Sequence, residues 1–261
     1  MCGSSENEPN GIERSDPDLL PNERVDDLQF NGLRIIQSLD SFCFGTDSVL
    51  LAGFANPKRS DNCIDLGAGS GVLSILLNER TGCRMTAVEE DAAQCGRLER
   101  SVIMNGQTDE LRFGRGIRVL HTDYIKNTKE LGLCAFDSAV CNPPYFRRDC
   151  GIISASGTAT HELTADIGSV ARAASALLKF GGKLFICFPS FRLSEAFLAL
   201  NAAGMEPKRL RLVSVRAEKA PYLALIESKK GAKSGLIIEK PLIIHSENGE
   251  YTDEVKEIYH E

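Results

Sequence analysis

The chain has 261 residues, of which 43% are hydrophobic, which is enough for one domain with a full core. No apolar run approaches the roughly 18 residues of a membrane span, and the polar, acidic start is unlike a secretory signal. The nine cysteines are scattered, odd in number and without a C-x-x-C pair, which predicts reduced thiols in a cytoplasmic protein and argues against a zinc or iron–sulfur site.

The net charge of −6 is concentrated at the two ends of the chain. Residues 1–27 hold eight acidic and two basic residues, and residues 247–261 hold six and one, so residues 28–246 carry a net charge of +5. The middle of the chain is therefore compatible with a polyanionic partner. Residues 1–23 are polar, and we expect them to form a disordered acidic leader.

A short amino-terminal module is predicted over residues 24–56, before the first strong strand. Thr46 and Asp47 stand at the start of an apolar segment in this module, and Asp47 is predicted to cap a helix over residues 48–55. The amino end of such a helix favours anionic groups.

The next segment is an apolar strand that runs through a glycine-rich turn into a helix predicted over residues 71–80. Glycines allow positive φ and let the backbone approach a ligand closely. A dinucleotide-binding turn would have its third glycine one residue later. This spacing, with an aspartate inside the strand end, favours S-adenosylmethionine as the ligand. The predicted cofactor-binding residues of the turn are Asp65, Gly67, Ala68, Gly69 and Gly71.

Two further predicted strands lead to carboxylates. The strand over residues 84–90 reaches Glu89, and a carboxylate about 20 residues beyond such a turn can accept both ribose hydroxyls; Glu90 is the alternative. The strand over residues 117–121 leads to Asp123, which can accept a hydrogen bond from an adenine amino group. Each acid alone can be a solvated strand end, but parallel strands bring their carboxyl ends to one edge, where ligands bind.

A predicted buried strand over residues 136–141 is followed by Asn142, Pro143, Pro144 and Tyr145. The Asn142 side-chain oxygen and the Pro143 carbonyl can each accept one hydrogen of a planar NH2 group, and Pro144 holds Pro143 extended. Tyr145 offers a face on which a conjugated ring can stack. The tetrapeptide therefore predicts an acceptor site for an amino group attached to a π-system.

The residues after this motif are predicted to contact the substrate. Phe146, Arg147 and Arg148 follow directly, and the two arginines are expected to meet phosphates beside the target nucleotide. Residues 146–162 are rich in glycine and serine, and they are either a mobile substrate loop or a surface connection.

The other elements complete an alternating α/β pattern. Cys141, the pair His161-Glu162 and His245 are interpreted as structural. Gly181 and Gly182 are predicted to end a helix. The expected elements are helices over 91–105, 163–180 and 192–203, a strand over 183–188, and an antiparallel hairpin of strands over 208–216 and 221–228.

The order of the glycine turn, Glu89, Asp123 and the Asn142–Tyr145 motif resembles the class I S-adenosylmethionine-dependent methyltransferases that modify exocyclic or amide nitrogens. Residues 25–29, 32–37 and 44–52 are similar to the amino-terminal part of the bacterial tRNA1(Val) adenine-37 N6-methyltransferase family. Residues 235–244 and 251–252 are similar to its carboxyl terminus. The resemblance implies a Rossmann-like, seven-stranded, mostly parallel sheet with an antiparallel carboxyl-terminal hairpin and helices on both faces. It also implies one domain over 24–261, with a catalytic core over 57–230 and an extension over 231–261.

The resemblance further implies N6-methylation of an adenine in tRNA, with S-adenosylmethionine as cofactor and without a metal. The catalytic residues would be Asn142, Pro143 and Tyr145, and Asn142 would also bind the cofactor. Thr46 and Asp47 would be cofactor-binding residues, because the helix that begins near them would face the methionine carboxylate. Methylation of a protein glutamine amide stays open, because that amide is also a planar NH2 group. DNA adenine, rRNA guanine and a non-catalytic RNA- or cofactor-binding protein are further alternatives, and the oligomeric state stays open.

Overall fold

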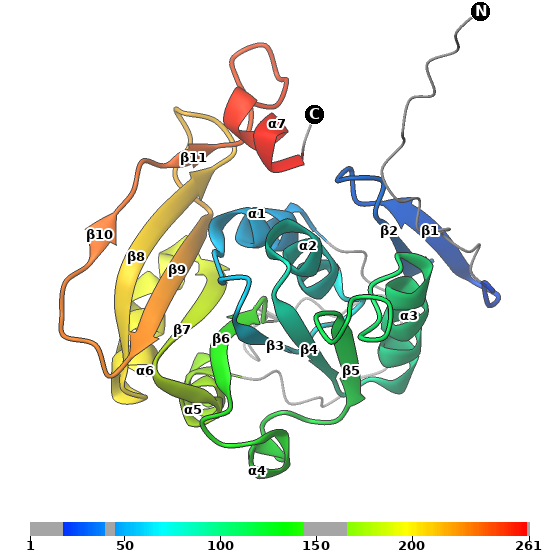
Figure 1. Ribbon diagram of the computed structural model, residues 1–261. Helices are drawn as coiled ribbons and strands as arrows, with labels where there is room; N and C mark the ends of the chain where they lie inside the picture. Colours follow the sequence, from blue (N-terminus) through cyan, green and yellow to red (C-terminus); the bar gives the residue numbers. More distant parts are fainter. Residues whose placement is uncertain (1–17, 40–44, 144–165, 260–261) are drawn as a thin grey trace, which may run out of the picture.

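The computed structural model describes residues 18–39, 45–143 and 166–259. Its centre is a mixed sheet in the order β10-β8-β9-β7-β6-β3-β4-β5, with β11 also paired to β8 (Figure 1). The strands of this sheet are β3 (Asn62–Leu66), β4 (Arg84–Glu89), β5 (Ile117–His121), β6 (Phe136–Cys141), β7 (Leu178–Pro189), β8 (Met205–Ser214), β9 (Leu223–Lys230), β10 (Ile237–Ile238) and β11 (Leu242–Ile243).

The sheet is parallel from β5 to β7, and β9 then runs antiparallel to both β7 and β8. Seven long strands therefore form the core, and two short strands add to its edge. This arrangement confirms the predicted fold: a seven-stranded, mostly parallel sheet with an antiparallel hairpin.

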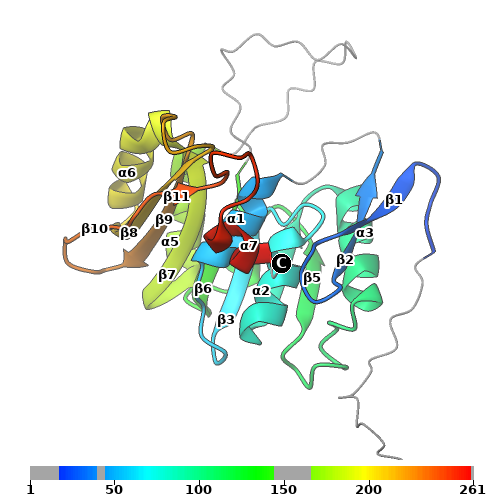
Figure 2. The ribbon, with the colours of Figure 1, turned by 90° about the horizontal axis from the view of Figure 1, so that it is seen from above.

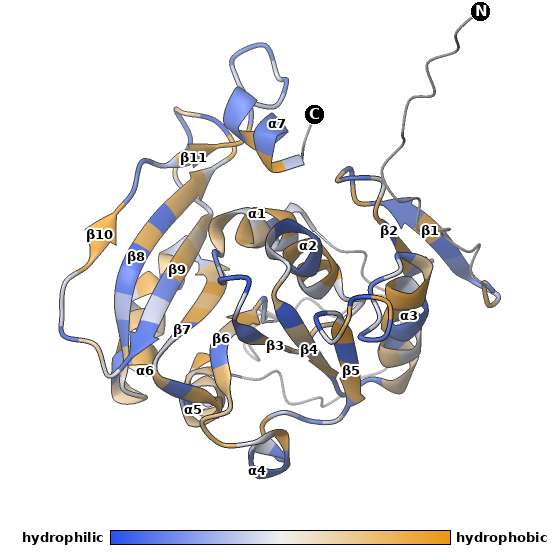
Figure 3. Ribbon diagram, viewed as in Figure 1, coloured by the Kyte–Doolittle hydropathy of each residue, from blue (hydrophilic) through white to orange (hydrophobic). Residues whose placement is uncertain are grey.

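Helices cover both faces of the sheet, as predicted. One buried cluster joins α1 (Thr46–Phe54), α2 (Val72–Thr81) and α3 (Ala92–Met104) to one face, and a second joins α5 (Ile167–Leu177) and α6 (Leu193–Ala202) to the other. The short α4 (Thr128–Leu131) follows β5. In Figure 3 hydrophobic residues dominate α1, whose buried side chains belong to the first cluster.

The ends of the described chain pack on the α1–α3 side. The hairpin of β1 (Glu23–Asp27) and β2 (Arg34–Ser38) lies beside α3, where the Ile36 N–H donates to Ser101 Oγ at 2.9 Å. The helix α7 (Asp253–Tyr259) lies near α1 (Figure 2), and the Arg80 guanidinium donates to the carbonyl of Ile258. None of the helices in the described parts of the chain has the length and apolar character needed to cross a membrane.

One predicted helix end is wrong. The helix α5 ends at Leu177 and β7 begins at Leu178, so Gly181 and Gly182 lie within β7. Gly181 has a φ of 79°, and a Cβ on Gly182 would lie 2.9 Å from the carbonyl oxygen of Lys179. The two glycines therefore allow an irregular start of the strand, and they do not stop the helix.

Candidate active site

The glycine turn lies between β3 and α2, against the end of β4 (Figure 1). Gly67, Gly69 and Gly71 have φ values of 72°, 56° and 95°, a region that glycine adopts without strain. The backbone N–H groups of Gly67 and Ala68 donate to the carbonyl of Val88 at 3.0 and 2.9 Å. The turn is therefore fixed by its own backbone at the carboxyl edge of the parallel strands.

Glu89 is buried at the end of β4, and both of its carboxylate oxygens accept backbone hydrogen bonds. Oε2 accepts from the Gly69 N–H at 2.7 Å, and Oε1 accepts from the Asp91 N–H at 2.9 Å. Because each carboxylate oxygen has more than one acceptor position, both can also meet ligand hydroxyls. The alternative acid, Glu90, is exposed, and its carbonyl lies 3.0 Å from Nε2 of His121.

Asp65 is fully buried behind the turn. Its Oδ2 accepts from the Ser74 hydroxyl at 2.8 Å, whereas Oδ1 has no hydrogen-bond partner among the described residues. Burial raises the pKa of this carboxyl to about 7, with a smaller contribution from the charge of Glu89, and the Ser74 hydrogen bonds oppose the shift. The structure therefore places Asp65 between the turn and α2, shielded from solvent.

Asp123 follows β5 and holds the next turn of the chain. Its Oδ1 accepts from the backbone N–H groups of Ile125 and Lys126 at 2.8 and 3.1 Å, and its Oδ2 lies 2.7 Å from Lys126 Nζ. Burial raises the pKa of Asp123, but the bonds from Lys126 and Ile125 lower it by more, so the net pKa is below the ordinary value. The carboxylate is thus an ionised acceptor near the end of β5.

Asn142 follows β6, and both ends of its side-chain amide are bonded. Nδ2 donates to Ser48 Oγ at 2.8 Å, and the Cys187 thiol donates to Oδ1 at 3.1 Å. Pro143 is buried beside it. The described half of the acceptor motif therefore lies at the same sheet edge as the glycine turn. Outside the described residues lie Pro144, Tyr145, Phe146, Arg147, Arg148 and the pair His161-Glu162.

Cys141 is buried at the end of β6, and its thiol donates to the carbonyl of Leu66 at 3.2 Å. Burial raises the pKa of this thiol, with the nearby carboxyl of Asp65 adding to the shift, which keeps it protonated. A nucleophilic thiolate is not favoured here, and the geometry fits the interpretation of Cys141 as a core residue.

Asp47 lies inside the first turn of α1, so its predicted role as the helix cap is wrong. The helix begins at Thr46, with Gly45 as the N-cap and no side-chain cap bond. The Asp47 carboxylate instead accepts a hydrogen bond from the Tyr222 hydroxyl at 3.1 Å. Burial raises the pKa of Asp47, and this hydrogen bond opposes the shift. The contact ties α1 to the chain between β8 and β9.

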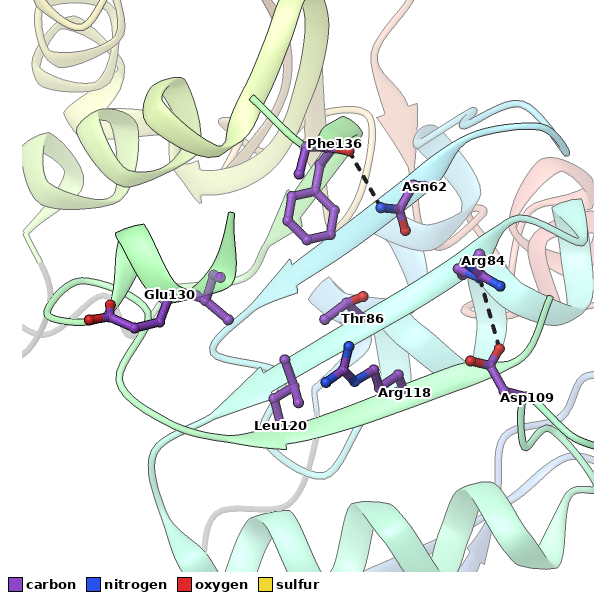
Figure 4. A pocket seen from close by; sticks show the side chains of 10 residues that line it. Asn62, Arg84, Thr86, Asp109, Arg118, Leu120, Glu130 and Phe136 are labelled. Atoms are coloured by element: carbon purple, nitrogen blue, oxygen red, sulfur yellow. Dashed lines mark hydrogen bonds and ion pairs between the residues drawn. The ribbon is translucent and has the colours of Figure 1, made fainter. Parts of the chain in front are cut away.

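A groove of about 290 Å³ lies elsewhere on the sheet (Figure 4). The Arg118 guanidinium points toward Thr86 there, whereas Glu130 points away. None of the site residues predicted from the sequence lines it, and its strand residues include the first positions of β3, β4 and β6, so it is separate from the carboxyl edge. The lining residues are Asn62, Arg84, Thr86, Asp109, Arg118, Leu120, Glu130, Leu131, Ala135 and Phe136.

Metal ions in proteins are bound by sets of His, Cys, Asp or Glu side chains. Among residues 18–39, 45–143 and 166–259, no group of three or more His, Cys, Asp or Glu side chains is placed to hold a metal ion.

Comparison with known proteins gives matches over most of the chain. The family described as "Methyltransferase small domain" matches residues 28–202. The protein named "tRNA1(Val) (adenine(37)-N6)-methyltransferase" of Shewanella sediminis (strain HAW-EB3) is 28% identical over 222 residues, 81% of this chain and 88% of the relative. The protein of the same name from Porphyromonas gingivalis is 29% identical over 244 residues, 88% of this chain and 92% of the relative.

Two solved structures show the same fold. A predicted O-methyltransferase from Agrobacterium tumefaciens is 24% identical with a TM-score of 0.66, and the match covers 82% of this chain and 95% of the other. The 16S rRNA N2 G1207 methyltransferase of T. thermophilus is 21% identical with a TM-score of 0.56, and the match covers 82% of this chain and 52% of the other.

Proposed function

The chain belongs to the methyltransferase small domain family, and from this premise we propose that it methylates the N6 amino group of an adenine in tRNA, at position 37 of tRNA1(Val). It is an S-adenosylmethionine-dependent methyltransferase. The observation that carries a planar amino group as the methyl acceptor is the position of Asn142 and Pro143 after the carboxyl end of β6, next to the strand β3 that leads into the glycine turn. The names of the relatives that match 81% and 88% of the chain support adenine in tRNA as the acceptor.

The residues at this edge fit the cofactor. The glycine turn has no side chains at three positions of positive φ, so its backbone can lie directly against a ligand. The buried Glu89 carboxylate, fixed by Gly69 and Asp91, is suited to two neighbouring ribose hydroxyls. Asp123 is an ionised acceptor just after the next strand, β5. When bound, S-adenosylmethionine supplies a methyl group on a positively charged sulfur.

The role of the acceptor motif follows from the electronics of an exocyclic amine. The nitrogen lone pair of adenine N6 is delocalised into the ring, which makes it a poor nucleophile. Hydrogen bonds from its two N–H groups to Asn142 Oδ1 and to the Pro143 carbonyl draw electron density onto nitrogen and fix its direction. Orientation of this kind can supply about 7–11 kcal/mol of a barrier. The proton can leave to water, so no strong base is required.

The surface at the carboxyl end of β7, the strand that carries Cys187 next to Asn142, supports a nucleic-acid substrate. Phe191 follows the carboxyl end of β7, next to β6, and 82% of its surface is exposed. The turn between β8 and β9 packs beside it, because the Ser190 N–H donates to the carbonyl of Tyr222 at 3.0 Å. Arg216 and Lys219 are exposed on that turn. An exposed aromatic ring with nearby cations is the combination that binds single-stranded nucleic acid.

The test is an activity assay on the purified protein with radiolabelled S-adenosylmethionine and total tRNA, followed by mass-spectrometric identification of the methylated nucleoside. We expect N6-methyladenosine, and a rate reduced on the order of 100-fold or more in Asn142→Ala with cofactor binding retained. A release-factor protein serves as the competing acceptor. Methylation of its glutamine amide with no label in tRNA would overturn the RNA proposal, and label in neither would overturn both.

A further inference from the structure

Two elements far apart in the sequence hold the amide of Asn142 from opposite ends. Ser48, on α1, accepts from Nδ2 at 2.8 Å, and Cys187, on β7, donates its thiol hydrogen to Oδ1 at 3.1 Å. Cys141 pairs with Ile186 in the register of β6 and β7. The residues that follow these two, Asn142 and Cys187, therefore lie side by side. Cys187 is completely buried and Ser48 is nearly so, which excludes bulk water from competing for these bonds.

The two ends of this side chain are not equivalent for the chemistry. An amide rotated by 180° about its last bond would present NH2 in place of oxygen, and a donor would then face the hydrogens of the amino substrate. A serine hydroxyl can donate or accept, so Ser48 can bind either end of the amide. A thiol is a weak donor and a weak acceptor, and an amide oxygen is a better acceptor than sulfur. Reversal of the amide would replace the bond from the Cys187 thiol to Oδ1 by an N–H···S contact, so Cys187 favours the orientation with Oδ1 toward sulfur. An amide oxygen has two lone pairs, which makes a bond from this thiol compatible with one from a substrate.

We propose that Ser48 and Cys187 are positioning residues for methyl transfer: Ser48 fixes the place of the Asn142 amide, and Cys187 selects the orientation that presents the oxygen to the amino group. This inference rests on the proposed function, because it assigns Asn142 as the acceptor of a substrate N–H. Neither residue has to touch the substrate or the cofactor. Ser48 and Cys187 affect catalysis by holding the side chain of Asn142.

The experiment compares Cys187→Ala, Cys187→Ser and Ser48→Ala in steady-state tRNA methylation. Cys187→Ala and Ser48→Ala should lower kcat on the order of 10-fold, with KM for tRNA and Kd for S-adenosylmethionine unchanged. Cys187→Ser offers a hydroxyl that can donate to Oδ1 or accept from Nδ2, so it should recover part of the kcat lost in Cys187→Ala without reaching the value of the parent. Cys63→Ala is the matched control, because Cys63 is an equally buried thiol in the same core cluster and should change kcat by less than about 2-fold.

An unchanged kcat in Cys187→Ala, or equal losses in Cys187→Ala and Cys63→Ala, would overturn the proposal. A second readout does not need a substrate: the NMR signals of the Asn142 side-chain NH2 should shift and exchange faster with solvent in Ser48→Ala but not in Cys63→Ala. If the parent protein methylates no RNA, the proposed function fails while this spectrum still decides whether the two residues hold the amide. If methylation is normal and the spectra of all variants agree, the positioning role is wrong.

Discussion

The Glu89 carboxylate at the end of β4 accepts a hydrogen bond from the backbone N–H of Gly69 at 2.7 Å. The acid that the sequence pattern assigns to a ribose therefore also shapes the turn that lies against the cofactor. Its second oxygen is held by the N–H of Asp91, which is the N-cap of α3. The buried Glu89 side chain therefore links the glycine turn, the end of β4 and the start of α3.

Replacing Glu89 with glutamine tests this coupling. One end of the new amide is NH2, which must face the N–H of either Gly69 or Asp91, and the charge that strengthens bonds to ribose hydroxyls is lost. We expect the Kd for S-adenosylmethionine to rise roughly 10- to 100-fold, since a hydrogen bond to a charged group contributes about 1.5–3 kcal/mol. Isothermal titration calorimetry measures it, with Glu90→Gln as the neutral control. Equal affinities of the two variants would contradict the assignment of Glu89.

Gly71 leaves no room for a side chain. Its φ is 95°, and a Cβ at this position would lie 2.0 Å from Leu98 Cδ1 on α3. Gly71→Ala should therefore lower the free energy of unfolding by about 1–3 kcal/mol, through backbone strain and displacement of Leu98. Urea denaturation of the two proteins measures the difference.

The matched control for Gly71 is a glycine within α3, the helix that carries Leu98. Gly96 lies within α3 with helical neighbours, and a Cβ there would meet nothing within 4 Å. Gly96→Ala should keep or raise the stability by up to about 1 kcal/mol, because alanine is the better helix former. Similar losses at both positions would show that the contact with Leu98 is not the cause at Gly71.

The sequence pattern predicts those parts of the site that depend on local order along the chain. The strand–turn–helix around Gly69 and the strands that lead to Glu89, Asp123 and Asn142 follow from hydrophobic period and turn chemistry. Because the sheet is parallel there, these ends share one edge. The wrong predictions concern single residues at element ends: Asp47 does not cap α1, and Gly181 lies in β7.

The local sequence does not predict which side chains form hydrogen bonds with one another at the site. Ser48 and Asn142 are 94 residues apart in the chain, and Cys187 is 45 residues beyond Asn142. The bond between Tyr222 and Asp47 spans 175 residues. Nothing in the local sequence marks such pairs, because they depend on how α1 and the β8–β9 turn pack over the ends of β6 and β7.

Asp65 predicts a pH dependence of stability. Its folded-state pKa of about 7 lies above the ordinary value of 3.8. Between these pH values the folded protein binds a proton that the unfolded chain has lost, so stability falls as pH rises, and the full cost of the buried charge is present above about pH 7. Asp65→Asn should be more stable than the parent by about 2–4 kcal/mol at pH 8, with the difference shrinking toward pH 4. Denaturant midpoints of both proteins at pH 8, 6 and 4.5 measure this difference. A difference that stays the same at all three pH values would refute the raised pKa of Asp65.

The exposed residues near the carboxyl end of β7 should contribute to RNA affinity in two separable ways. The double variant Arg216→Ala with Lys219→Ala removes two cations from the β8–β9 turn and should weaken tRNA binding at low salt. The slope of the logarithm of the tRNA association constant against the logarithm of the salt concentration should fall by about 1.4, because each phosphate contact with a single strand contributes roughly 0.7. Phe191→Ala removes a stacking face, and should weaken binding by about 1–3 kcal/mol with the slope unchanged.

Both variants have matched controls at the opposite edge of the sheet. The double variant Lys58→Ala with Arg59→Ala removes one lysine and one arginine from exposed positions before β3. Phe180→Ala removes an aromatic ring that is 81% exposed near the start of β7. Fluorescence anisotropy with labelled tRNA from about 50 to 200 mM salt, the range over which such contacts change affinity strongly, separates the two effects. Because the substrate must lie where Asn142 faces it, the controls should bind tRNA like the parent. Equal losses at both edges would mean that net charge, and not this surface, governs the affinity for RNA.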